Sequence, residues 1–434
     1  MRNILFFNEI YPIRNEFTHH SAIATGVFDP LAKQLCGLGH DARIVANPPV
    51  LEKLLTTKSS PGNRLIHLTV DEFEDVSKLV GNWALSGRHL WREYVVGETR
   101  DEYSVIERIL TRIYNDVMQF EFVVLWSHNE YVGNLVRAFG ATPVFMELAP
   151  MRRPFPMSLY VDPLGVNGST ALNCQEFEDY AKTLEPLSDL HGFFERRNAD
   201  PMKHVNPIDH LYSFDAHRKV EEKIRTRGER PKVLVPMQIG DDTNLFAGSP
   251  FGDTDDFIRR LIPNLDRSRY DFYFKPHPGA VNRGGWVALD QQRAVDRLTN
   301  AGFEVLETEV DESTYLSFLT CFDAVVTINS SVGFEAMLLG KSVVNLGNAM
   351  YSPSGATDYH AVMSALDEAS ERKEQNLRIA SAMFKICLLD RGAFISDATS
   401  FLERIEAVSQ FNENSRSEYF ELIGQKFPYQ TWIN

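Results

Sequence analysis

The sequence predicts an α/β protein built from two Rossmann-like domains. Short β-branched apolar runs alternate along the chain with segments of helical spacing, which is typical of parallel sheets covered by helices. The length of 434 residues favours two to three domains. The hydrophilic segment 218–232 is the best candidate for a linker. We therefore expect one domain at 1–220 and a second at 228–410.

The first half carries the elements of one such domain. The expected elements are a strand at 3–7, a helix at 29–38, strands at 42–45 and 122–126, and a helix that ends at 139. Gly39 follows the first helix directly and is expected to end it. Ser127, His128 and Asn129 follow a strand, and a role in capping the next helix explains them most simply.

In the second half, Asn329, Ser330 and Ser331 form a predicted strand-to-helix turn. The run 323–328 is apolar and β-branched enough for a buried strand, and 332–339 has helical spacing. The first amides of a helix lack intrahelical acceptors and carry partial positive charge. Together with the two serine hydroxyls they form a cradle for phosphate. A plain helix N-cap is the alternative interpretation.

A second motif, Lys-Pro-His-Pro, begins at Lys275 directly after the predicted strand 271–274. The two prolines stiffen the turn, so that Lys275 and His277 are held at fixed positions beside a sheet edge. A lysine pairs with phosphate as a point charge, and an imidazole donates a hydrogen bond or a proton to a leaving oxygen. The alternative for His277 is a purely structural side chain.

The third motif runs from Gln238 to Asp242, in the loop after the predicted strand 233–237. Two adjacent acids in this loop raise the alternative of a metal site. We expect no metal, because Lys275, His277 and a helix N-terminus supply the same stabilisation of a phosphate. Asp242 is then left for chemistry as a nucleophile or a base.

A denser acidic cluster consists of Asp253, Asp255 and Asp256. It precedes residues of helical apolar spacing, beginning with Phe257. We therefore expect these acids in the first turn of a helix, where the helix dipole favours them.

Taken together, the Gln-x-x-x-Asp, Lys-Pro-His-Pro and Asn-Ser-Ser-x-Gly-x-Glu motifs resemble those of the bacterial capsule-polysaccharide synthesis family. Its best-understood members are β-Kdo glycosyltransferases, which move the sugar acid Kdo from CMP-Kdo onto a growing surface glycan. The His-Pro and Ser-Ser elements are also similar to those of bacterial sialyltransferases, which use another CMP-activated sugar acid. The resemblance covers residues 230–360 well and the first half weakly.

The resemblance implies catalytic roles for Asp242, Glu147 and His277. Asp242 matches the catalytic aspartate and would be the nucleophile of a retaining transfer. His277 would assist the departure of CMP. Glu147 matches an acid that acts as base for the acceptor hydroxyl, although related enzymes carry an acidic-x-Gly element and this chain reads Glu-Leu-Ala. The alternative for Glu147 is a helix cap or an ion pair with Arg152 or Arg153.

The remaining matched residues are expected to bind the donor. They are Gln238, Lys275, His277, Asn329, Ser330, Ser331 and Glu335. Glu335 would accept hydrogen bonds from the ribose hydroxyls, and a surface pairing with Lys341 is the alternative.

The resemblance also implies the GT-B arrangement, in which the two domains face a central cleft. The acceptor would bind to 1–220 and the CMP-sugar donor to 228–410, while the tail 411–434 would pack back on the first domain. The implied partners are the donor and a glycan or lipid-linked glycan, with peripheral association with a membrane assembly complex. No metal or other cofactor is implied.

Composition narrows the function classes. The formal charge of −15 argues against a nucleic-acid partner. No signal peptide and no apolar run of about 20 residues is found, so the expected location is the cytoplasm, with the inner face of the inner membrane as the alternative.

Three functions stay distinct on the sequence alone. The first is the retaining β-Kdo transferase. The second is a transferase of another CMP- or CDP-activated donor, such as a sialic-acid-like sugar or a polyol phosphate. The third is a non-catalytic GT-B module that binds glycan or nucleotide.

Overall fold

The computed structural model describes residues 1–10, 21–56, 62–86, 88–150, 158–186, 224, 229–283, 285–306, 315–386, 389–390 and 398–426. Contacts divide the chain into two compact units. The first unit comprises Met1–Glu147, Leu159–Val166 and Leu389–Asn414, and the second comprises Leu148–Ser158, Asn167–Leu388 and Ser415–Asn434. No helix of the described part is long and apolar enough to cross a membrane.

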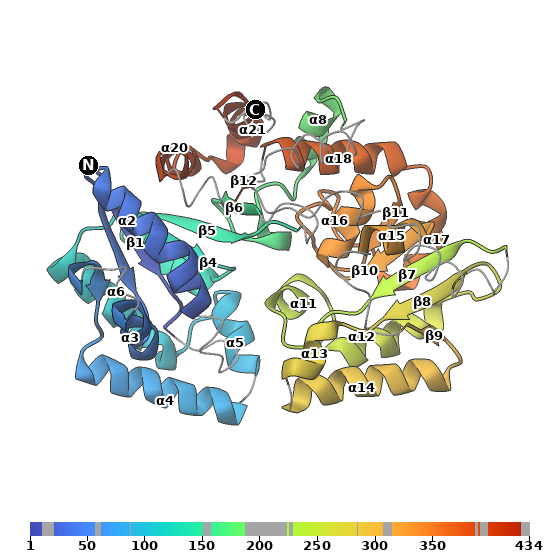
Figure 1. Cartoon of the computed structure of the whole chain (residues 1–434), viewed down its shortest axis with the longest axis horizontal. Helices are drawn as coiled ribbons and strands as arrows, with labels where there is room; N and C mark the ends of the chain where they lie inside the picture. Colours follow the sequence, from blue (N-terminus) through green and yellow to red (C-terminus); the bar gives the residue numbers. More distant parts are fainter. Residues whose placement is uncertain are drawn as a thin grey trace. The chain divides into compact units, whose positions relative to one another are not determined.

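The first unit contains a sheet with the strand order β12-β6-β5-β4-β1-β2-β3 (Figure 1). Its strands are β1 (Asn3–Phe7), β2 (Asp41–Val45), β3 (Leu65–Ile66), β4 (Phe122–Trp126), β5 (Thr142–Leu148), β6 (Ser158–Asp162) and β12 (Leu389–Asp390). β1 pairs in parallel with both β2 and β4. The strand order therefore reverses between β1 and β4, as in Rossmann-like folds, and the predicted α/β class is confirmed for this unit.

Helices complete the first unit. They include two π-helical turns (Ala24–Phe28 and Ile113–Val117), α2 (Asp29–Gly37), α3 (Pro48–Thr56), α4 (Val70–Ser86), α5 (Arg88–Val95), α6 (Ser104–Arg112), α7 (Glu130–Ala138) and α20 (Ala398–Val408). Gly39 has a φ of 86°, so the glycine after α2 supplies the left-handed residue that ends this helix. Phe401 of α20 is fully buried and stacks on Phe6 of β1, with ring centroids 6.1 Å apart. The segment 398–408, predicted within the second domain, thus belongs to the first unit because its apolar face completes this core.

The turn after β4 is capped by one of the three residues proposed from the sequence. The Asn129 side chain accepts a hydrogen bond from the Val132 amide (3.0 Å) and donates to Glu9 Oε2 (2.8 Å). His128 instead packs on Phe145, with ring centroids 5.8 Å apart. Its Nδ1 atom is buried without a hydrogen-bond partner in the described part of the chain. The prediction of a cap is therefore confirmed for Asn129 and wrong for His128.

We expect His128 to make stability depend on pH. Burial, and then the charge of Arg137, lowers the pKa of His128 to about 4. Between this value and the ordinary pKa of about 6.5, the unfolded chain binds the proton and the folded chain does not. The free energy of unfolding should therefore fall by about 2 kcal/mol as the pH drops from about 7 to about 4. Urea unfolding of His128→Phe across this range should show a shallower loss, and an unchanged pH slope would contradict the expectation.

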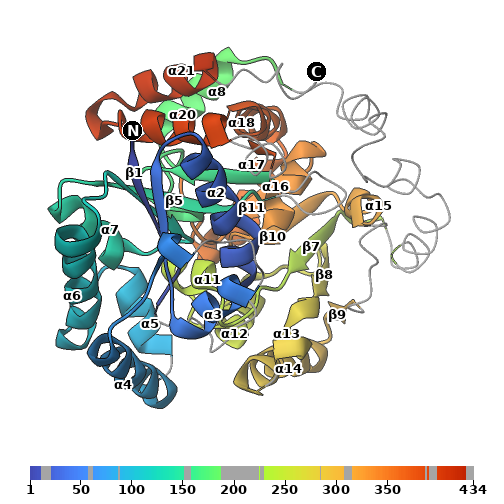
Figure 2. The ribbon, with the colours of Figure 1, turned by 60° about the vertical axis from the view of Figure 1, so that its left-hand side comes forward.

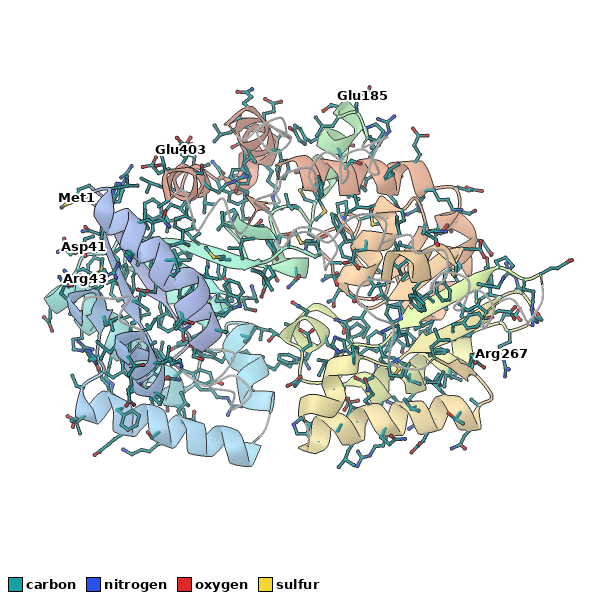
Figure 3. The ribbon with its side chains drawn as sticks, viewed as in Figure 1. Met1, Asp41, Arg43, Glu185, Arg267 and Glu403 are labelled. Carbon is teal, nitrogen blue, oxygen red and sulfur yellow. The ribbon has the colours of Figure 1, made fainter. Side chains whose placement is uncertain are left out.

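The second unit contains a parallel sheet with the strand order β11-β10-β7-β8-β9 (Figure 2). Its strands are β7 (Lys232–Pro236), β8 (Asp271–Lys275), β9 (Glu304–Val305), β10 (Ala324–Thr327) and β11 (Ser342–Asn345). Its helices are α8 (Gln175–Thr183), α11 (Thr243–Gly248), α12 (Thr254–Leu261), α13 (Pro278–Arg283), α14 (Gly285–Asn300), α15 (Tyr315–Thr320), α16 (Ser331–Leu338), α17 (Val362–Ala369), α18 (Lys373–Ile386) and α21 (Arg416–Lys426). Arg267, labelled in Figure 3, donates to the carbonyls of Ala301 and Gly302 just after α14. The second Rossmann-like unit is confirmed as well.

The boundaries of the units differ from the predicted ones at α8 and α21. α8 lies inside the predicted first domain, and α21 lies in the tail expected to pack on that domain. Both belong to the second unit, where Phe177 of α8 meets Phe420 of α21 edge to face at 5.2 Å. The two aromatic rings pack against each other, and this contact holds α8 and α21 together within the second unit.

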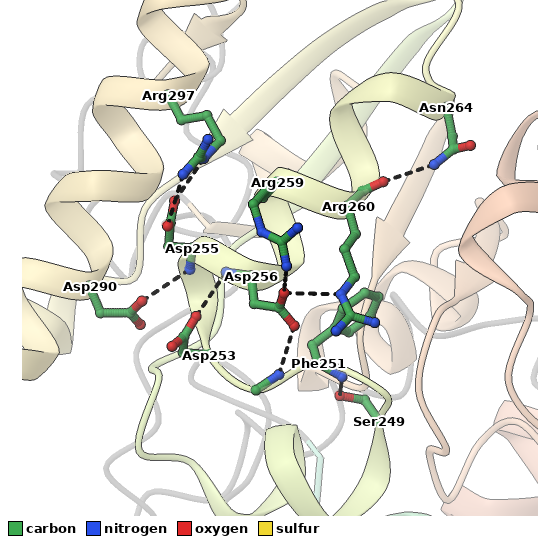
Figure 4. Close-up of polar contacts among 11 residues, drawn as sticks. Ser249, Phe251, Asp253, Asp255, Asp256, Arg259, Arg260, Asn264, Asp290 and Arg297 are labelled. Carbon is green, nitrogen blue, oxygen red and sulfur yellow. Dashed lines mark hydrogen bonds and ion pairs between the residues drawn. The ribbon is translucent and has the colours of Figure 1, made fainter.

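The acidic cluster lies at the start of α12 (Figure 4). The Asp253 carboxylate accepts a hydrogen bond from the Asp256 amide at 2.8 Å, while Asp255 pairs with Arg297. Asp290 of α14 accepts the amides of Thr254 and Asp255, each at 3.0 Å. The prediction of first-turn acids is confirmed for Asp255 and Asp256, whereas Asp253 is the N-cap that precedes the first turn.

Candidate functional site

The three sequence motifs leave the second sheet at the same edge. β10, β7 and β8 are neighbours and run in parallel, so their carboxyl ends lie side by side. Pro236 of β7 is in register with Lys275 of β8, and the Met237 amide donates to the Lys275 carbonyl at 2.9 Å. The edge therefore carries the loops at 238–242, 275–279 and 329–331, as in other open α/β sheets that place ligands there.

Gln238 and Asn329 join the first and third motifs directly. Gln238 Nε2 donates to Asn329 Oδ1 at 2.8 Å, and the backbone amide of Asn329 donates to Gln238 Oε1 at 3.2 Å. Both side chains are buried. A reciprocal buried pair of this kind fixes the two loops against each other, because either loop alone would leave polar atoms unsatisfied.

The side-chain amide of Asn329 also holds two further segments. Its Nδ2 donates to the carbonyls of Asn244 at 2.7 Å and Asn348 at 3.1 Å. The backbone of α11 and the loop after β11 are thus tied to the end of β10. Gly248 makes this approach possible, because a Cβ at this position would lie 2.8 Å from Asn329 Nδ2.

Asp242 is the N-cap of α11. Its Oδ1 accepts a hydrogen bond from the Asn244 amide at 3.0 Å. Since the Asn244 carbonyl accepts from Asn329, one residue connects the carboxylate of the first motif to the third motif. The side chain is half-buried, and its orientation is set by the cap.

The Lys-Pro-His-Pro turn orients the imidazole of His277. The His277 amide donates to Gln291 Oε1 at 2.8 Å, and the Gly279 amide donates to His277 Nδ1 at 3.0 Å. Because Nδ1 accepts, a neutral ring carries its proton on Nε2. His277 is therefore held in the tautomer that presents Nε2 as a donor.

Lys275, His277 and Ser330 line one small pocket of about 30 Å³. Val332, the two prolines of the turn and the end of β7 complete its walls. The second and third motifs thus converge, as predicted. Asp242 does not line this pocket, although the loop that carries Asp242 starts beside it. The structure therefore brings the lysine, the imidazole and the serine together without the aspartate. The volume is too small for a nucleotide, and a nucleotide donor would extend beyond it.

The two serines have different environments. Ser330 is the N-cap of α16, and its hydroxyl accepts from the Val332 amide at 3.4 Å. Its carbonyl accepts from the Tyr351 hydroxyl. By contrast, the Ser331 hydroxyl oxygen is buried and has no hydrogen-bond partner within the described residues. The capping interpretation is confirmed for Ser330, whereas the fold leaves the Ser331 hydroxyl unsatisfied.

We expect Ser331→Ala to separate ligand binding from stability. The hydroxyl makes no internal hydrogen bond among the described residues, so its removal should change the free energy of unfolding by less than about 0.5 kcal/mol. If the hydroxyl binds phosphate, the dissociation constant for CMP should rise about 5- to 10-fold. Calorimetry with CMP and urea unfolding give the two values. Unchanged CMP affinity would remove Ser331 from the site.

Glu335 lies deeper than the sequence indicates. Its side chain is fully buried in α16, and it is absent from the lining of the small pocket. Burial, and then the charge of Glu335, raises the pKa of the Tyr351 hydroxyl. Lys341 donates to the Thr320 carbonyl at 3.0 Å instead of extending along the helix surface. The alternative of a surface pair between Glu335 and Lys341 is therefore wrong, and the structure does not bring Glu335 to the pocket surface.

Glu147 lies near the carboxyl end of β5 in the first unit, where its side chain is half-buried. The other predicted site residues all belong to the second unit. Arg152 and Arg153, its alternative partners, lie outside the described residues. The role of Glu147 as a base stays a prediction.

Sequence reasoning missed Asn244, Gln291, Asn348 and Tyr351. Each of these residues makes a hydrogen bond that holds a predicted site residue in place. The Asn244 amide donates to Asp242, Gln291 accepts from the His277 amide, the Asn348 carbonyl accepts from Asn329, and the Tyr351 hydroxyl donates to the Ser330 carbonyl. Asn244 and Asn348 act through their main-chain groups, so their side-chain chemistry gives no signal. Tyr351 is an aromatic residue shortly after a strand end, which is a weak sign of a role near the site. Its contact with the Ser330 carbonyl follows only from the fold.

The fold and this edge define an α/β protein with a candidate anion site made by a lysine, a histidine and a helix N-terminus. The family model for "Capsule polysaccharide biosynthesis protein" matches residues 167–389, a little more than half of the chain. The protein belongs to this family, and all three motifs lie inside the matched segment.

Curated relatives match over shorter segments. "Capsule polysaccharide modification protein LipA" of Neisseria meningitidis serogroup A is 29% identical over 131 residues, which cover 30% of this chain and 17% of the relative. "Lipopolysaccharide-processing protein LpsZ" of Rhizobium meliloti is 28% identical over 148 residues, which cover 34% of this chain and 32% of the relative. The chain thus spans less than a third of the length of either relative.

Solved structures resemble the chain weakly. "Thermosulfurimonas dismutans KpsC, beta Kdo 2,7 transferase" is 14% identical, with a TM-score of 0.33, and the match covers 70% of this chain and 90% of that one. A sucrose-phosphate synthase from Thermosynechococcus elongatus is 11% identical, with a TM-score of 0.42, and covers 94% of this chain and 100% of that one.

Proposed function

We propose that this protein is a retaining β-Kdo glycosyltransferase that moves Kdo from CMP-Kdo to a bacterial surface glycan of the capsule or O-antigen type. The small pocket that joins Lys275, His277 and Ser330 carries the proposal. A cation, an Nε2–H donor and a helix N-terminus together suit the phosphate of a CMP-sugar. Membership of the capsule polysaccharide biosynthesis family supports a glycan as the acceptor.

The proposed reaction has two displacements at the anomeric carbon. The Asp242 carboxylate attacks this carbon, the bond from the carbon to the phosphate oxygen breaks, and CMP leaves with the electron pair. Lys275 and the Nε2–H of His277 stabilise the departing phosphate. An acceptor hydroxyl then attacks the same carbon, gives its proton to Glu147 and releases Asp242. Two inversions yield net retention.

The cap geometry is compatible with a nucleophile. One oxygen of Asp242 accepts the Asn244 amide, which fixes the side chain, and the reaction requires only the other oxygen. The phosphate charge is met by Lys275, His277 and the N-terminus of α16, so the proposed transfer needs no metal. The proposed location is the cytoplasm or the inner face of the inner membrane, where a membrane assembly complex would supply the acceptor.

The test combines CMP release with the mass of the intact protein after incubation with CMP-Kdo. Wild type is expected to release CMP and to gain the mass of one Kdo. Asp242→Asn should lose CMP release by about 1,000-fold and show no adduct, because an amide is a poor nucleophile. Asp241→Asn is the matched control and should retain release within about threefold.

The capping role of Asp242 favours one competing function, a non-catalytic module that binds nucleotide. Such a module would bind CMP, yet wild type would form neither adduct nor product. A transferase of polyol phosphate would release CMP from a CDP-polyol without a sugar adduct, because attack occurs at phosphorus. Either result would replace the Kdo transferase proposal.

A further inference from the structure

Two consecutive residues of α14, Asp290 and Gln291, contact different parts of the second unit. Both side chains are buried, with exposed fractions of 5% and 6%. Gln291 Oε1 accepts the His277 amide at 2.8 Å and so holds the Lys-Pro-His-Pro turn. Asp290 instead faces the amino end of α12 (Figure 4). The same point of α14 is therefore bonded both to the turn that carries the imidazole and to α12.

Asp290 satisfies two of the free amides at the start of α12. Its Oδ2 accepts the Thr254 amide and its Oδ1 accepts the Asp255 amide, each at 3.0 Å. The first amides of a helix have no acceptor within the helix, so these two bonds fix the amino end of α12 to α14. Since the carboxylate takes both amides at once, α12 cannot shift along α14 without leaving a buried donor unsatisfied.

Thr254 connects this fixed point to the first motif. Its side chain is fully buried, and its hydroxyl donates to the Gln238 carbonyl at 2.6 Å. Gln238 is the residue at which the loop that carries Asp242 begins. A continuous set of hydrogen bonds through α12 and α14 thus joins the imidazole turn to the start of the Asp242 loop.

The loop also lies directly on α14. A Cβ on Gly240 would collide with Asp290 Oδ2 and would lie 3.2 Å from Trp286 Cζ3, so the backbone of the loop approaches α14 as closely as only glycine allows. A small apolar cluster packs the loop, α13 and α14 together. Its members are Ile239, Ala280 and Val287. Packing and hydrogen bonds therefore attach the loop and the turn to the same helix.

We propose that Thr254 and Asp290 are positioning residues of the proposed transfer. Through them, α14 sets the distance between the His277 turn, which holds the leaving phosphate, and the Asp242 carboxylate. This role rests on the proposed function, because the distance matters only if the carboxylate reacts with the donor. A misplacement of about 1 Å costs about 100-fold in rate, whereas binding of the phosphate does not need the carboxylate. Loss of the Thr254 hydroxyl should therefore reduce turnover and leave CMP affinity intact.

Thr254→Val tests this role, because it keeps the shape of the side chain and removes the hydroxyl. Turnover in CMP release from CMP-Kdo should fall about 30-fold, and the dissociation constant for CMP should stay within about twofold of wild type. Hydrogen exchange of the amides in 239–245 should become about tenfold faster, while the amides of β7 and β8 exchange as in wild type. Thr254→Ala removes the same hydroxyl with a smaller side chain and should give the same pattern.

Two controls separate positioning from a general structural effect. Thr254→Ser retains the hydroxyl and should keep turnover and loop exchange within about threefold of wild type. Thr299→Val removes a hydroxyl from an exposed position of α14, where it donates to the Val295 carbonyl at 2.9 Å, and should change neither quantity.

Unchanged turnover or unchanged loop exchange in Thr254→Val and Thr254→Ala would overturn the positioning role. A loss of CMP affinity as large as the loss of turnover would also overturn it, because the whole site would then be disturbed. Failure of both variants to fold would do the same, since the hydroxyl would then serve the fold alone. If wild type releases no CMP from CMP-Kdo, the proposed function fails. Faster loop exchange would then still support the attachment of the loop through Thr254, and unchanged exchange would overturn it.

Discussion

Asn329→Asp is expected to lower the free energy of unfolding by about 3–4 kcal/mol and transfer activity by about 100-fold. The substitution keeps the oxygen that accepts from Gln238 and replaces Nδ2, which donates to the Asn244 and Asn348 carbonyls. Two carbonyl oxygens would then face a carboxylate oxygen in a buried position. α11 would lose its attachment to the end of β10, and Asp242 would move with it.

Urea unfolding and CMP release from CMP-Kdo measure the two effects. Asn414→Asp is the matched control, because Asn414 is exposed and the same charge is added there without burial. The control should stay within about 0.5 kcal/mol of wild type. A small effect of Asn329→Asp on both quantities would mean that the buried amide does not hold the loops together.

The strands of the second sheet could be predicted from the sequence because each is a local apolar run. β7, β8 and β10 all lie within one or two residues of their predicted bounds. Since these strands are neighbours, the meeting of their loops followed from the rule for parallel sheets. The residues that hold the loops together could not be predicted in this way. Asn329 donates to the main-chain carbonyls of two residues, and the side chains of those residues give no sign of this contact.

Glu335 shows a second limit of the sequence. Its place one turn into the helix suggested a carboxylate that accepts from the ribose hydroxyls, or else pairs with Lys341 on the surface, yet α16 is buried from Val332 to Leu338. A helix that is apolar on all faces is typical of a protein interior. The apolar residues around Glu335 therefore indicated that its side chain is buried, whereas its distance from the turn did not. The return of α20 to the first unit has no comparable signal, because an amphipathic helix does not specify which core it covers.

Gly333→Ala is expected to destabilise the second unit by about 2–3 kcal/mol, although alanine favours a helix over glycine by about 1 kcal/mol. A Cβ at this position would lie 2.5 Å from the Tyr351 hydroxyl oxygen and 3.0 Å from Thr327 Cγ2. The hydroxyl cannot simply move, because it donates to the Ser330 carbonyl at the N-cap of α16. The clash therefore acts on the turn that carries the candidate phosphate site, and CMP affinity should fall together with stability.

A double-mutant cycle with Tyr351→Phe identifies the cause. The single change should cost about 1 kcal/mol through the lost hydrogen bond to Ser330. In Gly333→Ala/Tyr351→Phe the clashing oxygen is gone, so the combined loss should be smaller than the sum of the two single losses. Gly37→Ala, at the end of α2 with no atom within 4 Å of the new Cβ, should not destabilise the protein. Additive losses in the cycle would show that crowding at the Tyr351 hydroxyl is not why glycine stands at position 333.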